Sequence, residues 1–346
     1  MGEGGPGHLF SRAAAVLCGQ AAVPHGGDLD AARRLFPEAP EPWLDLSTGI
    51  NPVPYPCPPL PPSAVERLPS AAEHRRLREA AALAYGAPDP ARVVPAPGTQ
   101  ILIETLPRLR APGRVAVLGP TYAEHAAAWT RSGHAVETVA DPDALAAADV
   151  AVVVNPNNPD GRRLPRSALL DLAGRLHGRG GLLVVDEAFA DFEPEDSLCG
   201  HPSPGLAVLR SFGKAYGLAG LRLGFVLAEP DLAAAVAAAL GPWAVSGPAL
   251  HIGAAALADL PWRAEAAASR LADAARLDRM IRRGGGEVVG GTALFRTADV
   301  ADGPALFRKL GEAGIYVRRF PEAPSRLRFG LPASPEDWCR LSRQLK

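Results

Sequence analysis

Lys214 is the residue of this chain with the clearest chemical potential, because the sequence otherwise almost avoids lysine. Only three of the 36 lysine and arginine residues are lysines, and one of them is the C-terminal residue. Arginine can replace most solvated lysines at little cost, but it cannot replace an amine that does covalent chemistry, because guanidinium stays protonated and is a poor nucleophile. Lys214 follows Ser211-Phe212-Gly213, directly after an apolar run typical of a buried strand. The sequence therefore predicts a reactive amine at a strand end, and a chance surface lysine is the alternative that this position alone leaves open.

Two further segments predict a binding site for a phosphate group near Lys214. Gly98-Thr99-Gln100 follows an expected strand and opens a helix, whose exposed N–H groups and positive dipole end suit a dianion. The Ser211 hydroxyl and the guanidinium of Arg222, eight residues after Lys214, could reach the same phosphate. Taken alone, Gly98 to Gln100 would more simply be a turn and a helix cap.

Two polar side chains at other strand ends would suit a heteroaromatic ring. The loop 155–161 carries two prolines and can hold one side-chain amide, that of Asn158, against a ligand oxygen. Asp186 ends another apolar run, and a buried carboxylate needs a cationic or hydrogen-bonding partner. A protonated pyridine nitrogen would be such a partner, and the pairing would keep the ring an electron sink. A surface turn and a helix cap remain the alternatives for each segment separately, but the four segments in this order predict pyridoxal 5′-phosphate (PLP) as the cofactor.

The composition describes a globular chain with room for about two domains. Of its 346 residues, 47% are hydrophobic, and the formal net charge of −1 provides no field that would attract nucleic acid or an anionic membrane. The four cysteines lie far apart and no His/Cys cluster accompanies them, so no metal site is predicted. The apolar runs 13–18 and 232–240 are too short for a signal peptide and a membrane span, respectively. We therefore expect a cytoplasmic protein that acts on a small molecule, without nucleic-acid or membrane partners.

The positions that could do chemistry need a scaffold, and short apolar runs that alternate with helical patterns predict an α/β fold. The runs lack polar alternation, which is typical of strands buried on both faces of a parallel sheet. The expected strands are 92–96, 115–118, 150–154, 182–185, 206–210 and 222–227. The expected helices among and before them are 74–85, 99–110, 122–132 and 166–178.

Both ends of the chain differ from this middle part. Seven prolines between Pro52 and Pro62 exclude a helix there and predict an extended segment. Residues 230–285 predict helices, broken at Gly241-Pro242 and Gly247-Pro248. After Glu287 the pattern predicts a smaller α+β unit with a strand to about Phe295, a helix over 304–313, strands over 315–318 and 326–330, and a final helix. We expect residues 1–50 to form an N-terminal arm and part of a small domain, 51–285 a large PLP-binding domain, and 286–346 the C-terminal small domain.

The motifs resemble, in order and over essentially the whole chain, those of class I/II aminotransferases of PLP fold type I. The matching segments are Gly98-Thr99-Gln100, residues 155–159, Asp186-Glu187-Ala188-Phe189 and residues 211–222. The resemblance implies a mostly parallel seven-stranded sheet flanked by helices, a smaller α+β domain and a homodimer.

The resemblance also implies a role for each matching residue. Lys214 would bond the cofactor, Asp186 would pair with the ring nitrogen, Asn158 would contact the ring hydroxyl, and Tyr122 would stack on the ring. Lys214 or the Tyr122 region would also supply a proton to the substrate. Arg328 would grip the substrate α-carboxylate. The cofactor phosphate would be held by Gly98, Thr99, Gln100, Ser211 and Arg222.

Two positions depart from the family pattern. Phe189 stands where many relatives carry a tyrosine that also bonds the ring hydroxyl. Leu68-Pro69 stands where relatives often have Tyr-Pro, whose tyrosine reaches the cofactor phosphate of the neighbouring subunit. Both departures weaken the prediction of a simple aminotransferase, while the prediction of PLP stays.

Within the family, the chain is most similar to the L-threonine-O-3-phosphate decarboxylases of cobalamin biosynthesis. The similar segments are His25-Gly26-Gly27-Asp28, residues 45–52 and residues 242–246. This resemblance implies decarboxylation of threonine phosphate to (R)-1-amino-2-propanol O-2-phosphate. Histidinol-phosphate aminotransferase or a related PLP aminotransferase is the nearest alternative. A non-catalytic PLP-binding regulator is a second one, but the N-terminal segment is too short and too little charged for a DNA-binding domain.

Both enzyme alternatives act on phosphorylated amines, so the site needs a second place for an anion. We predict that Arg318 (with Arg319 as a substitute), His25 and the Gly26-Gly27 backbone form it. The alternative is that Arg318 and Arg319 are solvated charges at a strand end, which is the commoner case. We expect Asn51, Asn158 and Arg328 to contact the same substrate.

Overall fold

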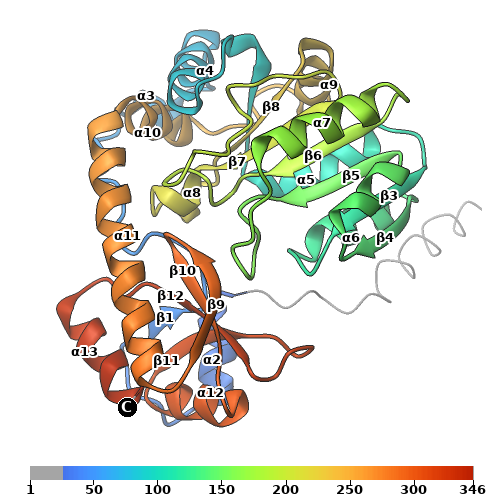
Figure 1. Ribbon diagram of the computed structural model, residues 1–346. Coiled ribbons are helices and arrows are strands. Elements are labelled where there is room, and N and C mark those ends of the chain that lie inside the picture. The colour runs from blue at the N-terminus through green and yellow to red at the C-terminus, as the bar shows by residue number, and fades with distance from the viewer. Residues whose placement is uncertain (1–25, 346) are drawn as a thin grey trace, which may run out of the picture.

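Residues 26–345 are described by a computed structural model, in which a long helix runs between a larger and a smaller sheet (Figure 1). The larger sheet has seven strands in the order β2-β8-β7-β6-β5-β3-β4. Strand β8 is antiparallel to its two neighbours, β2 and β7. The strands from β7 to β4 in this order pair with one another in parallel. The mostly parallel seven-stranded sheet is therefore confirmed. Its strands are β2 (Val93–Ala96), β3 (Arg114–Leu118), β4 (Ala135–Val139), β5 (Val150–Val154), β6 (Leu182–Asp186), β7 (Leu206–Ser211) and β8 (Gly224–Ala228).

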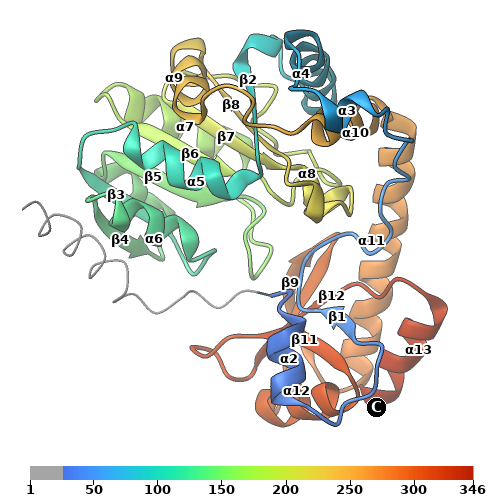
Figure 2. The same cartoon turned by 180° about the vertical axis from the view of Figure 1, so that it is seen from behind.

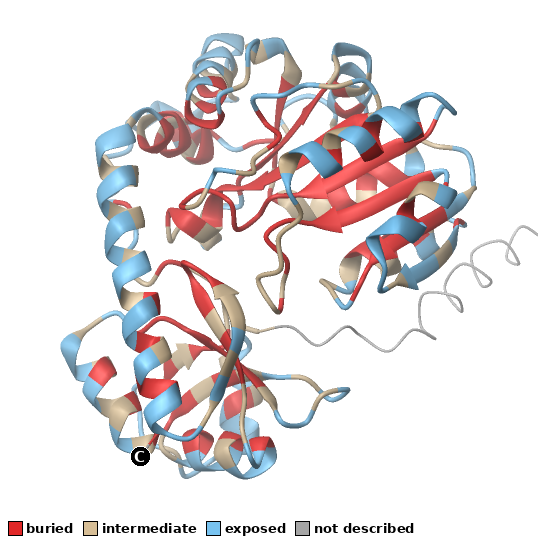
Figure 3. Cartoon of the chain, in the orientation of Figure 1, coloured by how far each residue is buried: buried red, intermediate tan, exposed pale blue. Residues whose placement is uncertain are grey.

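Alternate residues along the strands enter two separate hydrophobic cores, one on each face of this sheet. Val150 and Val152 of β5 belong to one core, whereas Ala151 and Val153 belong to the other. The first core is covered by α5 (Thr99–Arg108), α6 (Glu124–Arg131) and α9 (Pro230–Leu240). The second is covered by α4 (Ala71–Tyr85), α7 (Arg166–His177) and α10 (Gly247–Ala258). Figures 1 and 2 show α5 and α7 on opposite faces, and Figure 3 shows the strands between them buried.

The smaller sheet brings the two ends of the described chain together. Its order is β1-β11-β12-β10-β9, and Leu44 of β1 pairs in parallel with Ile315 of β11. Its strands are β1 (Leu44–Leu46), β9 (Glu287–Thr292), β10 (Phe295–Asp299), β11 (Ile315–Arg319) and β12 (Arg326–Gly330). The helices of this part are α2 (Leu29–Leu35), α12 (Gly303–Glu312) and α13 (Pro335–Gln344).

Helix α11 (Leu260–Arg283) connects the two parts, running from beside α10 to the smaller sheet (Figures 1 and 2). The proline-rich residues 52–62 contain no helix, as expected, and lead into the short helix α3 (Ser63–Glu66). The remaining short elements are α8 (Phe212–Ala215) and the 3₁₀ turns η1 (Pro90–Arg92), η2 (Pro142–Ala147) and η3 (Ala219–Leu221).

The structure differs from the sequence-based expectation at several boundaries. The single strand expected up to Phe295 is wrong, because β9 and β10 form an antiparallel hairpin there. The turn is held by a hydrogen bond from the Leu294 N–H to the Thr292 hydroxyl, and the two glycines before it, Gly290 and Gly291, lie inside β9 rather than in the turn. Helix α4 begins before His74, since Ser70 and Glu73 form a reciprocal cap. The division of the chain at residues 50 and 285 stays a prediction. Within residues 26–345, no helix is long and apolar enough to cross a membrane.

Candidate active site

A cavity of about 470 Å³ lies where the carboxyl ends of the parallel strands face the smaller sheet. The larger sheet contributes the residues that follow β2, β3 and β5 and those that end β6 and β7. The opposite wall comes from Ser47 to Gly49, after β1, and from the loop between β11 and β12. Each strand end is fixed by the buried strand behind it, so the site is built on rigid elements.

Lys214 projects from α8, directly after β7, into this cavity. Burial lowers the pKa of its amine to about 8, and the positive charges of Arg328 and Arg222 act in the same direction, whereas Asp186 opposes them. The amine nitrogen lies 5.6 Å from the centre of the Phe189 ring. Roughly a tenth of this amine is therefore neutral, and hence nucleophilic, at pH 7, far more than for an ordinary lysine.

Asp186 presents a buried carboxylate to the same cavity and is held from behind by His125. Asp186 Oδ2 lies 2.9 Å from Nε2 of His125, and its Oδ1 accepts the Ala188 N–H at 3.0 Å. His125 is buried in α6 and was not predicted from the sequence. Its position three residues after Tyr122, on a helix that begins beside a ligand loop, is the signal that could have identified it.

An anion cradle lies at the start of α5. Gly98 adopts a left-handed φ of 85°, and no side chain caps the N-terminus of α5. A Cβ at Gly98 would lie 2.5 Å from Nη2 of Arg222, so glycine is needed for the guanidinium to approach the helix end. Arg222 itself has a φ of 53° and donates from Nη1 to the carbonyl of Ala219 at 3.1 Å. Thr99 and Ser211 complete the lining, which suits a phosphate.

Tyr122 and Gln100 form one side of the cavity. The Tyr122 hydroxyl donates to Oε1 of Gln100 at 3.2 Å, and burial raises the pKa of Tyr122 to about 12. The Tyr122 ring lies edge-on to that of His125, with the ring centres 6.1 Å apart. This arrangement fixes the aromatic ring at the mouth of the cavity without ionising its hydroxyl.

Arg328 is a buried cation in the opposite wall. Its Nη1 donates to Oδ1 of Asn158 and its Nη2 to the carbonyl of Ser47 at 2.8 Å. Its Nε has no hydrogen-bond partner among the described residues. Burial, and then the positive charge of Arg318, lower the pKa of Arg328 to about 10. Arg318 and Arg328 are paired neighbours on β11 and β12, and two adjacent arginines that repel each other favour an anionic ligand beside them.

Most of the residues predicted from the sequence meet in this cavity. Those that line it are Gly26, Gly98, Thr99, Gln100, Tyr122, Asn158, Asp186, Ser211, Lys214, Arg222, Arg318 and Arg328. The structure does not bring Gly27 or Asn51 to the cavity wall: Gly27 donates its N–H to the Ser47 hydroxyl at 2.7 Å, and Asn51 lies behind Lys214. The prediction for His25 lies outside the described residues.

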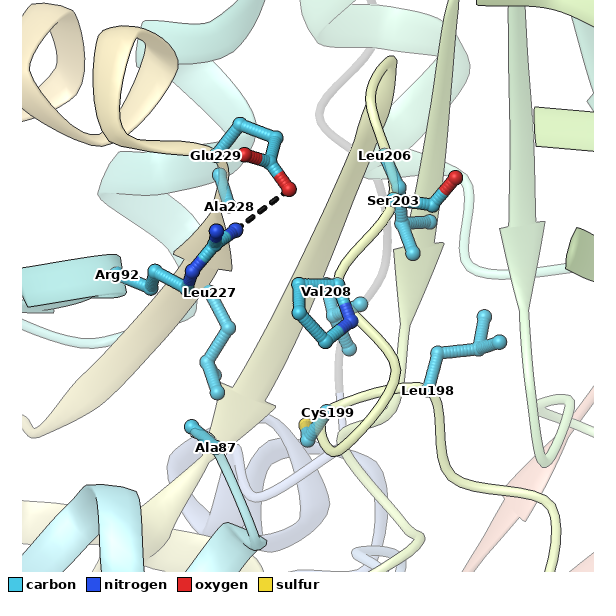
Figure 4. A pocket seen from close by; sticks show the side chains of 11 residues that line it. Ala87, Arg92, Leu198, Cys199, Ser203, Leu206, Val208, Leu227, Ala228 and Glu229 are labelled. Carbon is cyan, nitrogen blue, oxygen red and sulfur yellow. Dashed lines mark hydrogen bonds and ion pairs between the residues drawn. The ribbon is translucent and has the colours of Figure 1, made fainter. Parts of the chain in front are cut away.

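A second cavity lies at the far side of the larger sheet and has no comparable chemistry. It encloses about 10 Å³, and its polar lining includes the ion pair between Arg92 and Glu229, with 2.5 Å between nitrogen and oxygen (Figure 4). Cys199 is buried beside it, and burial raises the pKa of its thiol. Within residues 26–345, no group of three histidine, cysteine, aspartate or glutamate side chains could hold a metal ion.

Comparison with known proteins places this geometry in a family. The sequence model of "Aminotransferase class I and II" matches residues 63–340. A threonine-phosphate decarboxylase of Pseudomonas aeruginosa is 46% identical over 325 residues, which cover 93% of this chain and 96% of the relative. A threonine-phosphate decarboxylase of a Sinorhizobium species is 47% identical over 329 residues, with 94% and 98% covered.

The fold is also found in solved structures. The histidinol-phosphate aminotransferase of Sinorhizobium meliloti, solved in complex with pyridoxal 5′-phosphate, superimposes with a TM-score of 0.79 over 95% of each chain. Its sequence identity to this chain is 22%, so this likeness is one of fold.

Proposed function

The chain belongs to the aminotransferase class I and II family, and from this premise we propose that it is a PLP-dependent decarboxylase of L-threonine O-3-phosphate. The product would be (R)-1-amino-2-propanol O-2-phosphate, and the role in cobalamin biosynthesis follows from the same resemblance. The observation that carries the proposal is the identity of 46% and 47% to two threonine-phosphate decarboxylases over more than nine tenths of the chain. The residues that line the cavity support it, and we assign their roles below.

The residues present fit PLP. Because Gly98 has no side chain, the Arg222 guanidinium can lie beside the uncapped start of α5. The resulting cradle suits the cofactor phosphate. The buried carboxylate of Asp186, fixed by His125, suits a protonated ring nitrogen. Lys214 supplies the amine that bonds the cofactor. When bound, PLP withdraws electrons from the Cα atom of an amino acid and so weakens the bonds to that carbon.

The substrate carries two anionic groups, and the cavity has two arginines outside the phosphate cradle. We assign the α-carboxylate to Arg328, whose guanidinium is oriented by Ser47 and Asn158. We assign the substrate phosphate to Arg318 and the backbone at Gly26, which line the same cavity. Binding both ends of the substrate fixes its rotation about Cα, and this rotation decides whether the carboxylate or the hydrogen leaves.

Lys214 is also the proposed donor of the proton that replaces the carboxylate at Cα. Its pKa of about 8 lets the amine hold or release a proton near neutral pH. Tyr122, with its pKa raised to about 12, stays protonated near neutral pH and forms an uncharged part of the cavity wall.

We further propose that the protein forms a homodimer. Several large apolar side chains of the segment 53–68, together with Trp243, stay exposed in the single chain. The most exposed of them are Val65 and Leu68, at 68% and 67%. A second copy of the chain would cover these side chains, and sedimentation velocity at micromolar concentration would detect it. The cytoplasmic location stays a prediction from the sequence.

The reaction is tested by product analysis. The holoenzyme is incubated with threonine phosphate, with and without 2-oxoglutarate, and the products are identified by mass spectrometry. Carbon dioxide and aminopropanol phosphate without an acceptor are the expected result. Glutamate that appears only when 2-oxoglutarate is present would instead identify an aminotransferase and overturn the proposal.

A further inference from the structure

The backbone of Lys214 is held from outside the cavity by Asn51. Helix α8 has only four residues, and carbonyl groups at a helix end lack intrahelical partners. The Asn51 N–H donates to the carbonyl of Lys214 at 2.9 Å, and its side-chain Nδ2 donates to the carbonyl of Ala215 at 2.8 Å. Asn51 is 2% exposed, so water does not compete with these hydrogen bonds.

The amide of Asn51 is oriented by a residue of the long helix. Arg270 of α11 donates from Nη1 to Oδ1 of Asn51 at 3.1 Å, and the Val53 N–H donates to the same oxygen at 3.1 Å. With two donors at its oxygen, the amide must turn its nitrogen toward Ala215. Arg270 is itself fixed by Asp273, 2.7 Å from its Nη2.

The segment that carries Asn51 packs tightly along the residues after Lys214. A Cβ at Gly217 would lie 2.7 Å from both the carbonyl oxygen of Asn51 and the Cα of Pro54. The Tyr55 N–H donates to the carbonyl of Tyr216 at 2.9 Å. Residues 51–55 therefore form a fixed strap along residues 214–217.

We propose that Asn51 is a positioning residue for Lys214, and that Arg270 sets the direction of its amide. The pair directs the lysine side chain into the cavity between Asp186, Arg222 and Arg328, the three charges that act on its amine. The inference rests on the part of the proposed function that makes Lys214 the reactive amine. It does not depend on which amino acid is the substrate.

The first test uses cofactor-free protein and measures the amine itself. The variants Asn51→Ala and Arg270→Met are acylated at limiting reagent between pH 6 and 10, and the labelled peptides are quantified by mass spectrometry. Lys309 is exposed and serves as the internal reference. A loosened α8 admits water to the amine, so the midpoint of the Lys214 profile should rise by about one pH unit, toward that of an ordinary lysine.

The second test uses the holoenzyme. The kcat for threonine phosphate should fall about tenfold in Asn51→Ala, while KM changes less than about twofold, because the anion-binding arginines are untouched. The control is Arg283→Met, since Arg283 lies at the C-terminal end of the same helix and donates to the carbonyl of Arg279. It should keep the wild-type Lys214 midpoint and kcat.

The outcomes separate this inference from the proposed function. A wild-type midpoint and kcat in Asn51→Ala would overturn the positioning role, and so would equal changes in Arg283→Met. If Asn51→Ala does not fold, Arg270→Met decides by the same two criteria. A raised midpoint in an enzyme that does not decarboxylate threonine phosphate would support the inference while the proposed substrate fails.

Discussion

Replacing Lys214 by methionine is expected to stabilise the cofactor-free protein at neutral pH. The pKa of Lys214 is lowered from 10.5 to about 8, by burial first and then by Arg328 and Arg222, against the opposite effect of Asp186. Below pH 8 the lysine is protonated in both the folded and the unfolded chain, and the full cost of the buried charge is present. Between pH 8 and 10.5 the folded chain loses the proton while the unfolded chain keeps it, so stability rises with pH. Above pH 10.5 the lysine is neutral in both the folded and the unfolded chain, so the cost of a buried charge is absent.

The size of the effect follows from the shift. A difference of 2.5 pH units corresponds to about 3 kcal/mol at 1.36 kcal/mol per unit. Lys214 lines an open cavity and keeps part of its surface exposed. Water therefore relieves some of the cost of its buried charge. We therefore expect Lys214→Met to increase the free energy of unfolding by roughly 1–3 kcal/mol at pH 7.

Urea unfolding of cofactor-free wild type and variant at pH 7 and pH 10 measures this difference. The stability gain should shrink at the higher pH. Lys309→Met provides the matched control, because Lys309 is exposed and its loss should change stability little at either pH. A gain that is absent at pH 7, or that grows as the pH rises, would refute the reasoning about the buried amine.

Three further substitutions test the remaining parts of the cavity. His125→Phe removes the partner of a buried carboxylate, and kcat/KM should fall about 10- to 100-fold in steady-state assays. Unchanged kinetics would show that the histidine has no part in positioning. Gly98→Ala should weaken PLP binding at least about tenfold in equilibrium titrations, because a Cβ would displace the arginine of the cradle. Gly220→Ala, where a Cβ meets no atom within 4 Å, should bind PLP like the wild type, and equal affinities in both variants would contradict the cradle. Arg318→Ala should raise KM for threonine phosphate about tenfold, whereas Arg319→Ala, at an exposed position, should leave it near the wild-type value.

Most strands of the larger sheet could be predicted because each contains a short uninterrupted apolar run. Strands β5 and β6 lie within one residue of their predicted bounds. The edge strand β4 was missed, because its burial is poor along its length and its residues show no continuous apolar run. Strand β1 was missed as well, because it has only three residues and is defined by its pairing with β11, some 270 residues later in the chain.

The reactive groups of the cavity could be predicted for a related reason. Asp186 and Lys214 follow strands whose ends meet at one edge of the sheet, so local pattern and general topology are enough to bring them together. His125 could not be predicted in this way. Its partner lies 61 residues later in the chain, and only its position three residues after Tyr122 connects it with the site.

Asn51 shows where sequence reasoning reaches its limit. A polar residue directly before a proline, close to an expected ligand segment, suggests contact with the substrate. In the structure its side-chain amide instead donates to the carbonyl of Ala215, 164 residues later in the chain, and accepts a hydrogen bond from Arg270. This arrangement depends on how α11 passes behind the cavity, and no local pattern contains that information.

The segment around Asn51 also bears on the choice of reaction. Ser47, four residues earlier, accepts the Arg328 guanidinium at its carbonyl and the Gly27 N–H at its hydroxyl, and Asp45 holds that hydroxyl at 2.6 Å. One short segment thus contacts the backbone of Lys214, the amine proposed to react, and orients the arginine proposed to bind the carboxylate. The strand-end motifs supply chemistry that decarboxylases and aminotransferases of this fold have in common. Because the angle at Cα depends on where the substrate is gripped relative to the lysine, residues 45–55 are where a change of reaction should be sought.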